Sequence, residues 1–191
     1  PPSKISVIEY GADEPKSFRK EDLQAFGLES GNYYLIVARL VPENHIREMI
    51  EGFLQTSTSR KLIVVGTKDT SSYVRQLEDF QKPNVKFIGG VYDKQILDSL
   101  RAGAFAYLHG HSVGGTNPSL LEAMITGAIC VCHDNSFNRE VTDNAQIYFN
   151  SIPELARTLE KLENEPKEKL AEYKQKAVER VRTHYTWDRI C

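Results

Sequence analysis

The chain has 191 residues, of which 40% are hydrophobic, enough to fill the core of one large domain or two small ones. Lysine and arginine total 24 against 26 aspartate and glutamate, giving a formal net charge of −2, which excludes a basic surface for nucleic acid. No apolar run approaches the roughly 18 residues of a membrane span, and no charged-then-apolar leader opens the chain, so we expect a cytoplasmic protein.

Short β-branched apolar runs alternate with amphipathic stretches along most of the chain. After a short predicted strand over residues 4–10 and a turn at GADEP, the sequence predicts strands over residues 33–40, 61–66, 84–89, 104–110 and 128–133. Between them it predicts helices over residues 45–54, 71–80, 93–102 and 118–125. This alternation is typical of a mainly parallel sheet covered by helices on both faces, an α/β Rossmann-like three-layer sandwich.

The C-terminal part is charged and helical from residue 152 onward, with a break at Pro166, and its charges are typical of a solvated helix face. Just before it, Cys130 and Cys132 are separated by one residue in an apolar run, so both point the same way from a strand. We expect reduced core residues there, not a disulfide or a zinc site.

The stretch HGHSVGGTNPSLLEAMITG, residues 109–127, carries the strongest functional signal. Asn117 is a favoured N-cap and Pro118 suits the first helical position, so a helix should begin there. Gly114 and Gly115 precede its positive end, where bare backbone N–H groups favour an anion such as a diphosphate. The alternative is that the two glycines only form a turn.

Two charged residues fit the same ligand. Glu122 falls off the apolar stripe of its helix and is free to face a cleft, where a carboxylate can accept hydrogen bonds from the vicinal diol of a ribose. Arg39 follows the first central strand, where its planar fork can clamp a phosphate. His109 and His111 lie at the same edge of the sheet, and either contacts a phosphate or a sugar hydroxyl or caps local backbone. Surface positions remain the alternative for Arg39 and Glu122.

The succession GADEP, VARLVPEN, FIGGV and GGTNPSLLEAMITGAICV resembles the donor-binding half of retaining, metal-independent glycosyltransferases of the family-4 type, whose GT-B fold joins two Rossmann-like domains. The resemblance covers roughly residues 5–150. It implies that Arg39 binds the donor diphosphate and that Glu122 binds the ribose hydroxyls. It also implies donor contacts in two loops, at Gly115, Thr116 and Asn117 and at the base-pocket residues 89–92, which include Gly89 and Gly90.

Two departures from the family pattern are visible. A lysine is common a few residues after the arginine, but Asn44 or His45 stands in that region, and the family's earlier acidic residue falls on Gly114. These variants resemble a bacterial subgroup of rhamnosyltransferases that make surface polysaccharides, which implies a donor such as dTDP-rhamnose. With a deoxyribose donor, Glu122 would engage the 3′-hydroxyl alone.

The resemblance also implies how the chain is organised. Residues 1–185 would form the donor-binding domain, the C-terminal half of a GT-B enzyme, and residues 186–191 the start of a truncated crossover helix. The acceptor-binding N-terminal domain is absent, so we expect this chain alone to be inactive, with a nucleotide-diphosphate sugar as substrate and no separate cofactor. A peripheral association with the membrane is left open. The alternatives are half of a sugar-nucleotide 2-epimerase and a non-catalytic nucleotide-sugar-binding module.

Overall fold

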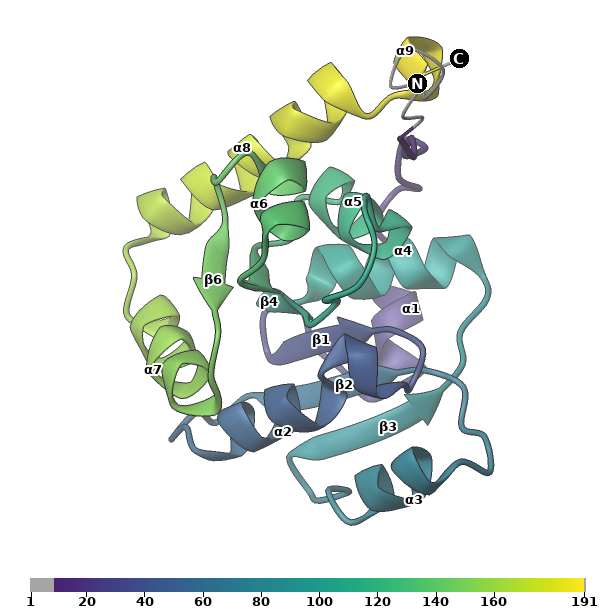
Figure 1. Cartoon of the computed structure of the whole chain (residues 1–191), viewed down its shortest axis with the longest axis vertical. Helices are drawn as coiled ribbons and strands as arrows, with labels where there is room; N and C mark the ends of the chain where they lie inside the picture. Colours follow the sequence, from purple (N-terminus) through teal and green to yellow (C-terminus); the bar gives the residue numbers. More distant parts are fainter. Residues whose placement is uncertain (1–8, 191) are drawn as a thin grey trace, which may run out of the picture.

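The apolar runs of the sequence form the strands of one parallel sheet in a computed structural model that describes residues 9–190 (Figure 1). The strand order is β3-β2-β1-β4-β5-β6, and every pair of neighbours is parallel. The strands are β1 Tyr33–Val37, β2 Lys61–Val65, β3 Val85–Gly89, β4 Ala106–His109, β5 Cys130–His133 and β6 Ile147–Phe149. The chain therefore runs outward from β1 in one direction and from β4 in the other.

Each predicted helix is present, with ends within a few residues of the expected ones. The helices are α1 Lys20–Gln24, the 3-10 helix η2 Pro42–Asn44, α2 Ile46–Leu54, α3 Ser72–Glu78, α4 Lys94–Gly103, α5 Pro118–Ile125, α6 Ser136–Thr142, α7 Ile152–Glu163, α8 Lys167–His184 and α9 Trp187–Ile190. The predicted break at Pro166 separates α7 from α8. None of the described helices is long and apolar enough to span a membrane.

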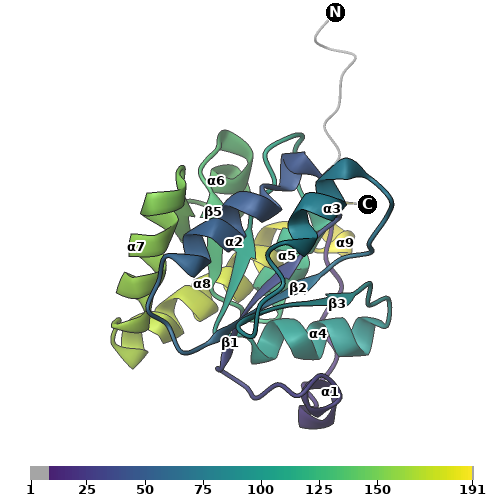
Figure 2. The ribbon, with the colours of Figure 1, turned by 90° about the horizontal axis from the view of Figure 1, so that it is seen from below.

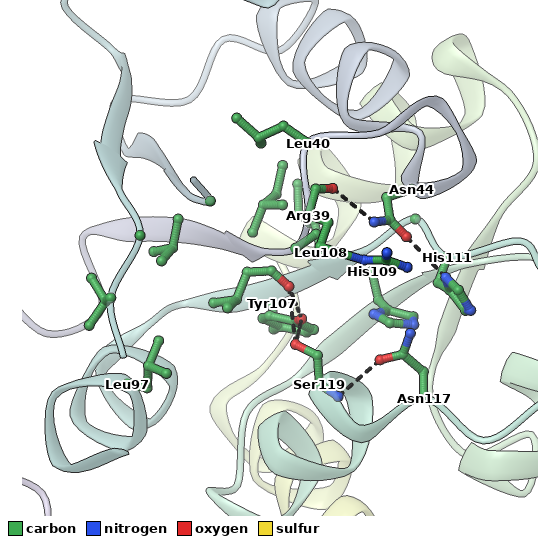
Figure 3. Close-up of a pocket in the computed structure, with 18 of the residues that line it drawn as sticks. Arg39, Leu40, Asn44, Leu97, Tyr107, Leu108, His109, His111, Asn117 and Ser119 are labelled. Atoms are coloured by element: carbon green, nitrogen blue, oxygen red, sulfur yellow. Dashed lines mark hydrogen bonds between the residues drawn. The ribbon is translucent and has the colours of Figure 1, made fainter. Parts of the chain in front are cut away.

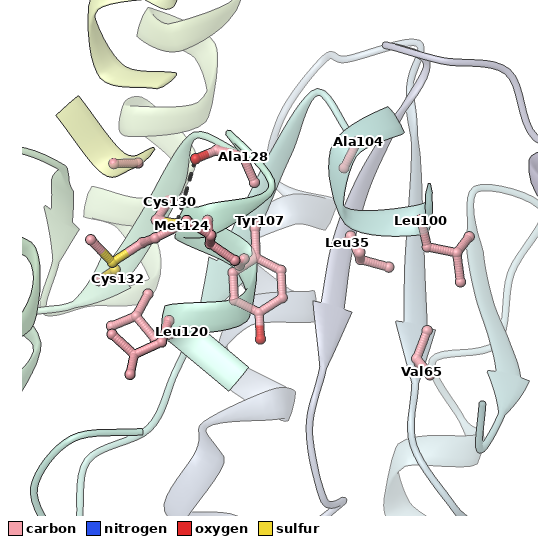
Figure 4. Close-up of a cluster of buried hydrophobic side chains, with 14 of the residues drawn as sticks. Leu35, Val65, Leu100, Ala104, Tyr107, Leu120, Met124, Ala128, Cys130 and Cys132 are labelled. Carbon is pink, nitrogen blue, oxygen red and sulfur yellow. Dashed lines mark hydrogen bonds between the residues drawn. The ribbon is translucent and has the colours of Figure 1, made fainter. Parts of the chain in front are cut away.

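Successive side chains of each strand enter two different cores, because a strand presents its residues alternately to opposite faces. Tyr34 and Ile36 of β1 pack with α2, α3 and α7 on one face. Tyr33 and Leu35 pack on the other face with α1, α4, α5 and α8, where Figure 4 shows Leu35, Leu100 and Met124. Figure 2 shows the sheet between the helix layers. The α/β Rossmann-like three-layer architecture is confirmed.

Some features differ from the sequence prediction. The first central strand ends at Val37 and not at residue 40, because the chain turns there into η2. Strand β6 and helices α1 and α6 were not predicted, since runs of three to seven residues give too little periodicity. The strand expected over residues 4–10 lies outside the described residues except for Glu9 and Tyr10, which form no regular structure.

Cys130 and Cys132 are free and buried in the core beneath α5 (Figure 4), as the sequence predicts. Burial raises the pKa of both thiols, because the low-dielectric core disfavours the thiolate. Both side chains point to the α5 face of the sheet. They are therefore core residues with little thiolate character.

Both thiols should resist alkylation while the chain is folded. In a Cys191→Ser background, we expect neither Cys130 nor Cys132 to react with a maleimide at pH 7.5, and both to react in 6 M guanidinium, because the thiolate is the reactive form. Mass spectrometry counts the labels. Labelling of either cysteine at the rate of a free thiol, in chain that remains folded by circular dichroism, contradicts the buried placement.

Candidate functional site

A cavity of about 810 Å³ opens at the carboxyl ends of the central strands (Figure 3). The chain leaves β1 toward one face of the sheet, where α2 packs, and leaves β4 toward the other, where α5 packs. The two exits diverge, and such a switch point in the strand order is where open parallel sheets bind ligands. The exits of β1, β2, β3 and β4, together with α4 and α5, line the cavity.

Helix α5 begins as predicted. The Asn117 side chain accepts a hydrogen bond of 2.9 Å from the Ser119 N–H, and Pro118 follows the cap (Figure 3). The first turn of α5 offers no free N–H at Ser119, because the cap uses it, and Pro118 has none. The unpaired amides lie in the loop that includes Gly114 and Gly115, since residues 114–117 donate no backbone hydrogen bond within the described part of the chain.

Asn44 connects two residues that the sequence placed in the site, Arg39 through its backbone and His111 through its side chain. Its Nδ2 donates to the Arg39 carbonyl at 2.8 Å, and its Oδ1 lies 3.0 Å from His111 Nδ1 (Figure 3). Asn44 is 8% exposed and lines the cavity. Both ends of its amide are therefore used inside the protein, so that Asn44 fixes the Arg39 and His111 segments instead of replacing a lysine charge.

The loop after β4 is fastened from both sides. His45 Nδ1 lies 2.8 Å from the Gly110 carbonyl, and the Nδ2 groups of Asn135 and Asn138 each donate to the His111 carbonyl at 3.0 Å. Gly110 has no room for a side chain, since an added Cβ would lie 2.1 Å from the Asn44 carbonyl oxygen. The backbone of residues 110–111 is thus held in one position at the cavity wall.

Glu122 lines the cavity and is not simply solvated. Its Oε2 accepts a hydrogen bond of 2.5 Å from Nη2 of Arg101, which α4 brings to the same wall. The Glu122 side chain is 42% exposed, whereas the Arg101 side chain is 2% exposed. Next to this pair, Tyr107 and Ser119 both donate to the Val37 carbonyl at 3.0 Å and so fasten the start of α5 to the end of β1.

The structure brings most, but not all, of the predicted site residues together. Those that line the cavity are Arg39, Asn44, Gly90, His109, His111, Asn117 and Glu122. Those that do not contribute to its wall are Gly89, Gly114, Gly115 and Thr116. Gly89 instead ends β3 with a φ of 80° and Gly114 has a φ of 98°, conformations that favour glycine in any turn.

Sequence reasoning missed Arg101, Asn135 and Asn138. Arg101 lies on the amphipathic helix α4, where an arginine is expected at the surface, and its partner is 21 residues away in sequence. Asn135 was recognisable as a helix N-cap, since it precedes α6 and its side chain accepts from the Asn138 N–H. Nothing in the sequence pattern points to its second contact, with His111.

His109 and His111 differ in their surroundings. His109 is 5% exposed, and its Nε2 has no hydrogen-bond partner among the described residues. Burial lowers the pKa of His109 to about 3, and the neighbouring His111 and His133 add to the effect. Burial also lowers the pKa of His111, helped by the nearby Arg39 charge. Both imidazoles are therefore neutral at pH 7.

A cavity at the switch point of a parallel sheet with this strand order defines the class of Rossmann-like ligand-binding domains. Residues 18–180 match the family model described as glycosyl transferases group 1. The chain therefore belongs to that family. No curated protein matches its sequence with significance.

Solved glycosyltransferase structures share the fold at low sequence identity. A glycosyltransferase from Rickettsia africae matches 98% of this chain and 55% of its own length, with a TM-score of 0.84 and 13% identity. Anabaena Alr3699/HepE in complex with UDP-glucose matches 97% of this chain and 54% of its own length, with a TM-score of 0.84 and 19% identity. Sucrose-phosphate synthase from Thermosynechococcus elongatus matches 97% of this chain and 49% of its own length, with a TM-score of 0.79 and 15% identity. The chain spans about half the length of these structures.

The buried His109 should make folding sensitive to mild acid. Its pKa is about 3 in the folded chain, whereas an unfolded histidine has a pKa of about 6.5, so the unfolded chain binds the extra proton between these values and stability falls as pH falls through this window. Between pH 7.5 and pH 5, His109 alone should cost about 2 kcal/mol of unfolding free energy.

The measurement is urea unfolding at both pH values for the wild type, His109→Gln and His184→Gln. His109→Gln should lose less stability on acidification than the wild type, while the exposed His184 serves as control and its variant should follow the wild type. An equal loss in all three chains contradicts a neutral, buried His109.

Proposed function

We propose that this chain binds the nucleotide-diphosphate sugar donor of a glycosyltransferase at the cavity between the exits of β1 and β4. The observation that carries the proposal is the chemistry gathered there: the exposed Arg39 guanidinium, the neutral His111 and the half-exposed Glu122 carboxylate line one cavity. Its volume of about 810 Å³ lies within the range of small-molecule sites, about 300–1,000 Å³.

The diphosphate is assigned to Arg39 and the loop before α5. The Arg39 side chain is exposed and makes no ion pair or hydrogen bond within residues 9–190, so its fork is free for a phosphate. The unpaired amides of residues 114–117, of which Asn117 lines the cavity, supply further donors, and the positive end of α5 adds a favourable dipole. The fold itself does not require glycine at position 115. The φ of Gly115 is not positive, and an added Cβ would meet no described atom within 4 Å.

The nucleoside is assigned to Glu122, whose carboxylate accepts hydrogen bonds from ribose hydroxyls. Gly90 belongs to the loop after β3 that would line the base pocket. The complex of Anabaena Alr3699/HepE with UDP-glucose supports a nucleotide sugar of this class. The particular variants of the motif favour a deoxy-sugar donor such as dTDP-rhamnose, used in surface-polysaccharide synthesis.

The sugar is assigned to the neutral His111. Because Asn44 Oδ1 can only accept, His111 Nδ1 is assigned the proton, which leaves Nε2 as an acceptor. Nε2 lies beside Gly114, 3.8 Å from the place that a Cβ on this residue would take. An acceptor without positive charge suits a sugar hydroxyl better than a phosphate oxygen. This role is consistent with the place of His111 beside the loop of residues 114–117.

The reaction we propose breaks the bond between the anomeric carbon and the diphosphate oxygen and forms one to the oxygen of an acceptor hydroxyl, whose proton passes to the leaving diphosphate, with retention and without a metal. Negative charge grows on the leaving diphosphate, and Arg39, the loop amides and the α5 dipole stabilise it. The acceptor saccharide would bind a second domain. We propose that these residues bind the donor and that turnover requires the second domain as well.

Two substitutions separate the parts of the donor. Arg39→Ala should lower the affinity for UDP, dTDP and GDP about tenfold or more, since a charge-assisted contact contributes about 1.5–3 kcal/mol. The affinity for inorganic pyrophosphate should fall as strongly. Glu122→Gln should lower the affinity for the nucleotides and leave the affinity for pyrophosphate unchanged. Amide chemical shifts of the isolated chain, titrated with each ligand, give the affinities. If Arg39 and residues 114–122 show no shift with any of the three nucleotides at millimolar concentration, donor binding at this cavity is excluded.

Gly115 tests the loop separately. Gly115→Ala should leave the unfolding free energy within about 0.5 kcal/mol of the wild type, because the new methyl meets no described atom, yet weaken UDP or dTDP several-fold by standing where the ligand approaches the backbone. Gly110→Ala is the contrasting variant and should destabilise the fold by about 1–3 kcal/mol through its clash with the Asn44 carbonyl. Unchanged nucleotide affinity in Gly115→Ala would remove the loop from the site.

A further inference from the structure

Arg101 is a fully buried cation in the wall of the candidate site. Its side chain is 2% exposed and lines the cavity from α4. An arginine does not lose its charge in a protein, so a buried guanidinium needs partners that offset its lost hydration. Its Nη2 donates to Glu122 Oε2 at 2.5 Å, whereas its Nε has no hydrogen-bond partner among the described residues.

The acidic residue on the same helix accounts for Arg101 only in part. Asp98 is 1% exposed, and its Oδ2 already accepts from Lys94 Nζ at 2.6 Å and from the Lys16 N–H at 2.9 Å. Arg101 Nη1 lies 3.7 Å from Asp98 Oδ1, an ion pair that is longer than a hydrogen bond. Asp98 therefore supplies a nearby counter-charge, whereas the hydrogen-bonded partner of Arg101 is Glu122.

The ion pair is asymmetric in a way that favours a ligand. Arg101 is buried, but the Glu122 side chain is 42% exposed to the cavity. The hydrogen bond holds Oε2 at the cavity wall, while Oε1 accepts no hydrogen bond within residues 9–190. A ligand hydroxyl that binds Oε1 then meets a side chain whose rotamer freedom is already restricted, which lowers the entropic cost of binding.

We infer that Arg101 is a positioning residue for the donor, holding Glu122 by Oε2 so that Oε1 is left to accept a ribose hydroxyl. The inference rests on the proposed function, because it assigns the ribose to Glu122. Arg101 acts through that carboxylate and not on the diphosphate. Its removal should therefore lower nucleotide affinity only while Glu122 is present.

The test is a double-substitution cycle with two kinds of ligand. Affinities for UDP, dTDP, GDP and inorganic pyrophosphate are measured by calorimetry or amide shifts for the wild type, Arg101→Met, Glu122→Gln and the double variant. Methionine keeps much of the buried volume, and glutamine keeps an oxygen that can accept from Arg101. Arg60→Met is the control, since Arg60 forms another Arg–Glu pair, 2.8 Å from Glu163, just before β2 begins at the opposite edge of the sheet.

We expect Arg101→Met to weaken the tightest-binding nucleotide about tenfold, at the lower limit of a charge-assisted contact. Pyrophosphate affinity should stay unchanged in Arg101→Met, and the double variant should bind nucleotide no more weakly than Glu122→Gln. Arg60→Met should bind every ligand as the wild type does.

Different results overturn different statements. If Glu122→Gln binds nucleotides normally, the assignment of ribose to Glu122 fails, and with it this part of the proposed function. If Glu122→Gln weakens nucleotides but Arg101→Met does not, the positioning role alone is wrong. Equal losses of nucleotide and pyrophosphate in Arg101→Met also overturn it, because they indicate a phosphate contact or a general loss of structure.

Arg101→Lys keeps the test open if the methionine variant does not fold. Lysine retains the charge but has a shorter side chain without a guanidinium, so it cannot place a donor where Arg101 Nη2 lies. The ratio of nucleotide to pyrophosphate affinity should fall at least threefold in Arg101→Lys, and adding Arg101→Lys to Glu122→Gln should not lower it below the ratio of Glu122→Gln alone. An unchanged ratio in the folded Arg101→Lys chain contradicts the positioning role.

Discussion

The reversal of strand order between β1 and β4, where successive strands stop being added on one side of the sheet and are added on the other, is the constraint on which the site depends. Both strands are buried and paired on both edges, so their backbone groups are satisfied and the chain can leave the sheet only at its ends. Right-handed crossovers then send α2 to one face and α5 to the other. The space between the diverging exits cannot be filled by either helix. The residues with functional chemistry lie around that space because the topology leaves it open.

A polar network makes this open edge rigid. Loop carbonyls at the end of a sheet need partners, and here amide and imidazole side chains supply them: Asn44, His45, Asn135 and Asn138 bind the carbonyls of Arg39, Gly110 and His111. These contacts join the exits of β1, β4 and β5. The neutral state of His111 belongs to the same arrangement, because partial burial and the nearby Arg39 charge both lower the pKa of this ring.

The sequence could predict what depends on local patterns. Asn117 and Pro118 identify the start of α5, and β-branched runs identify the five longer strands, since capping and periodicity are properties of neighbouring residues. Strand β6 has three residues and shows no period. Arg101 could not be assigned, because its role arises from the packing of α4 beside α5, and α4 by itself reads as an amphipathic helix with a surface arginine.

The buried charge of Arg101 is best explained by the side chain that it contacts. Replacing a buried ion pair by apolar residues of similar volume is often neutral or stabilising, so fold stability alone gives little reason to bury a guanidinium. Asp98 has other donors, and the pair therefore adds one function to the fold: it fixes a carboxylate at a cavity wall. Glu122 in turn supplies the charge that makes the buried Arg101 tolerable. Arg101 and Glu122 thus stabilise each other, and both line the cavity in which the proposed donor binds.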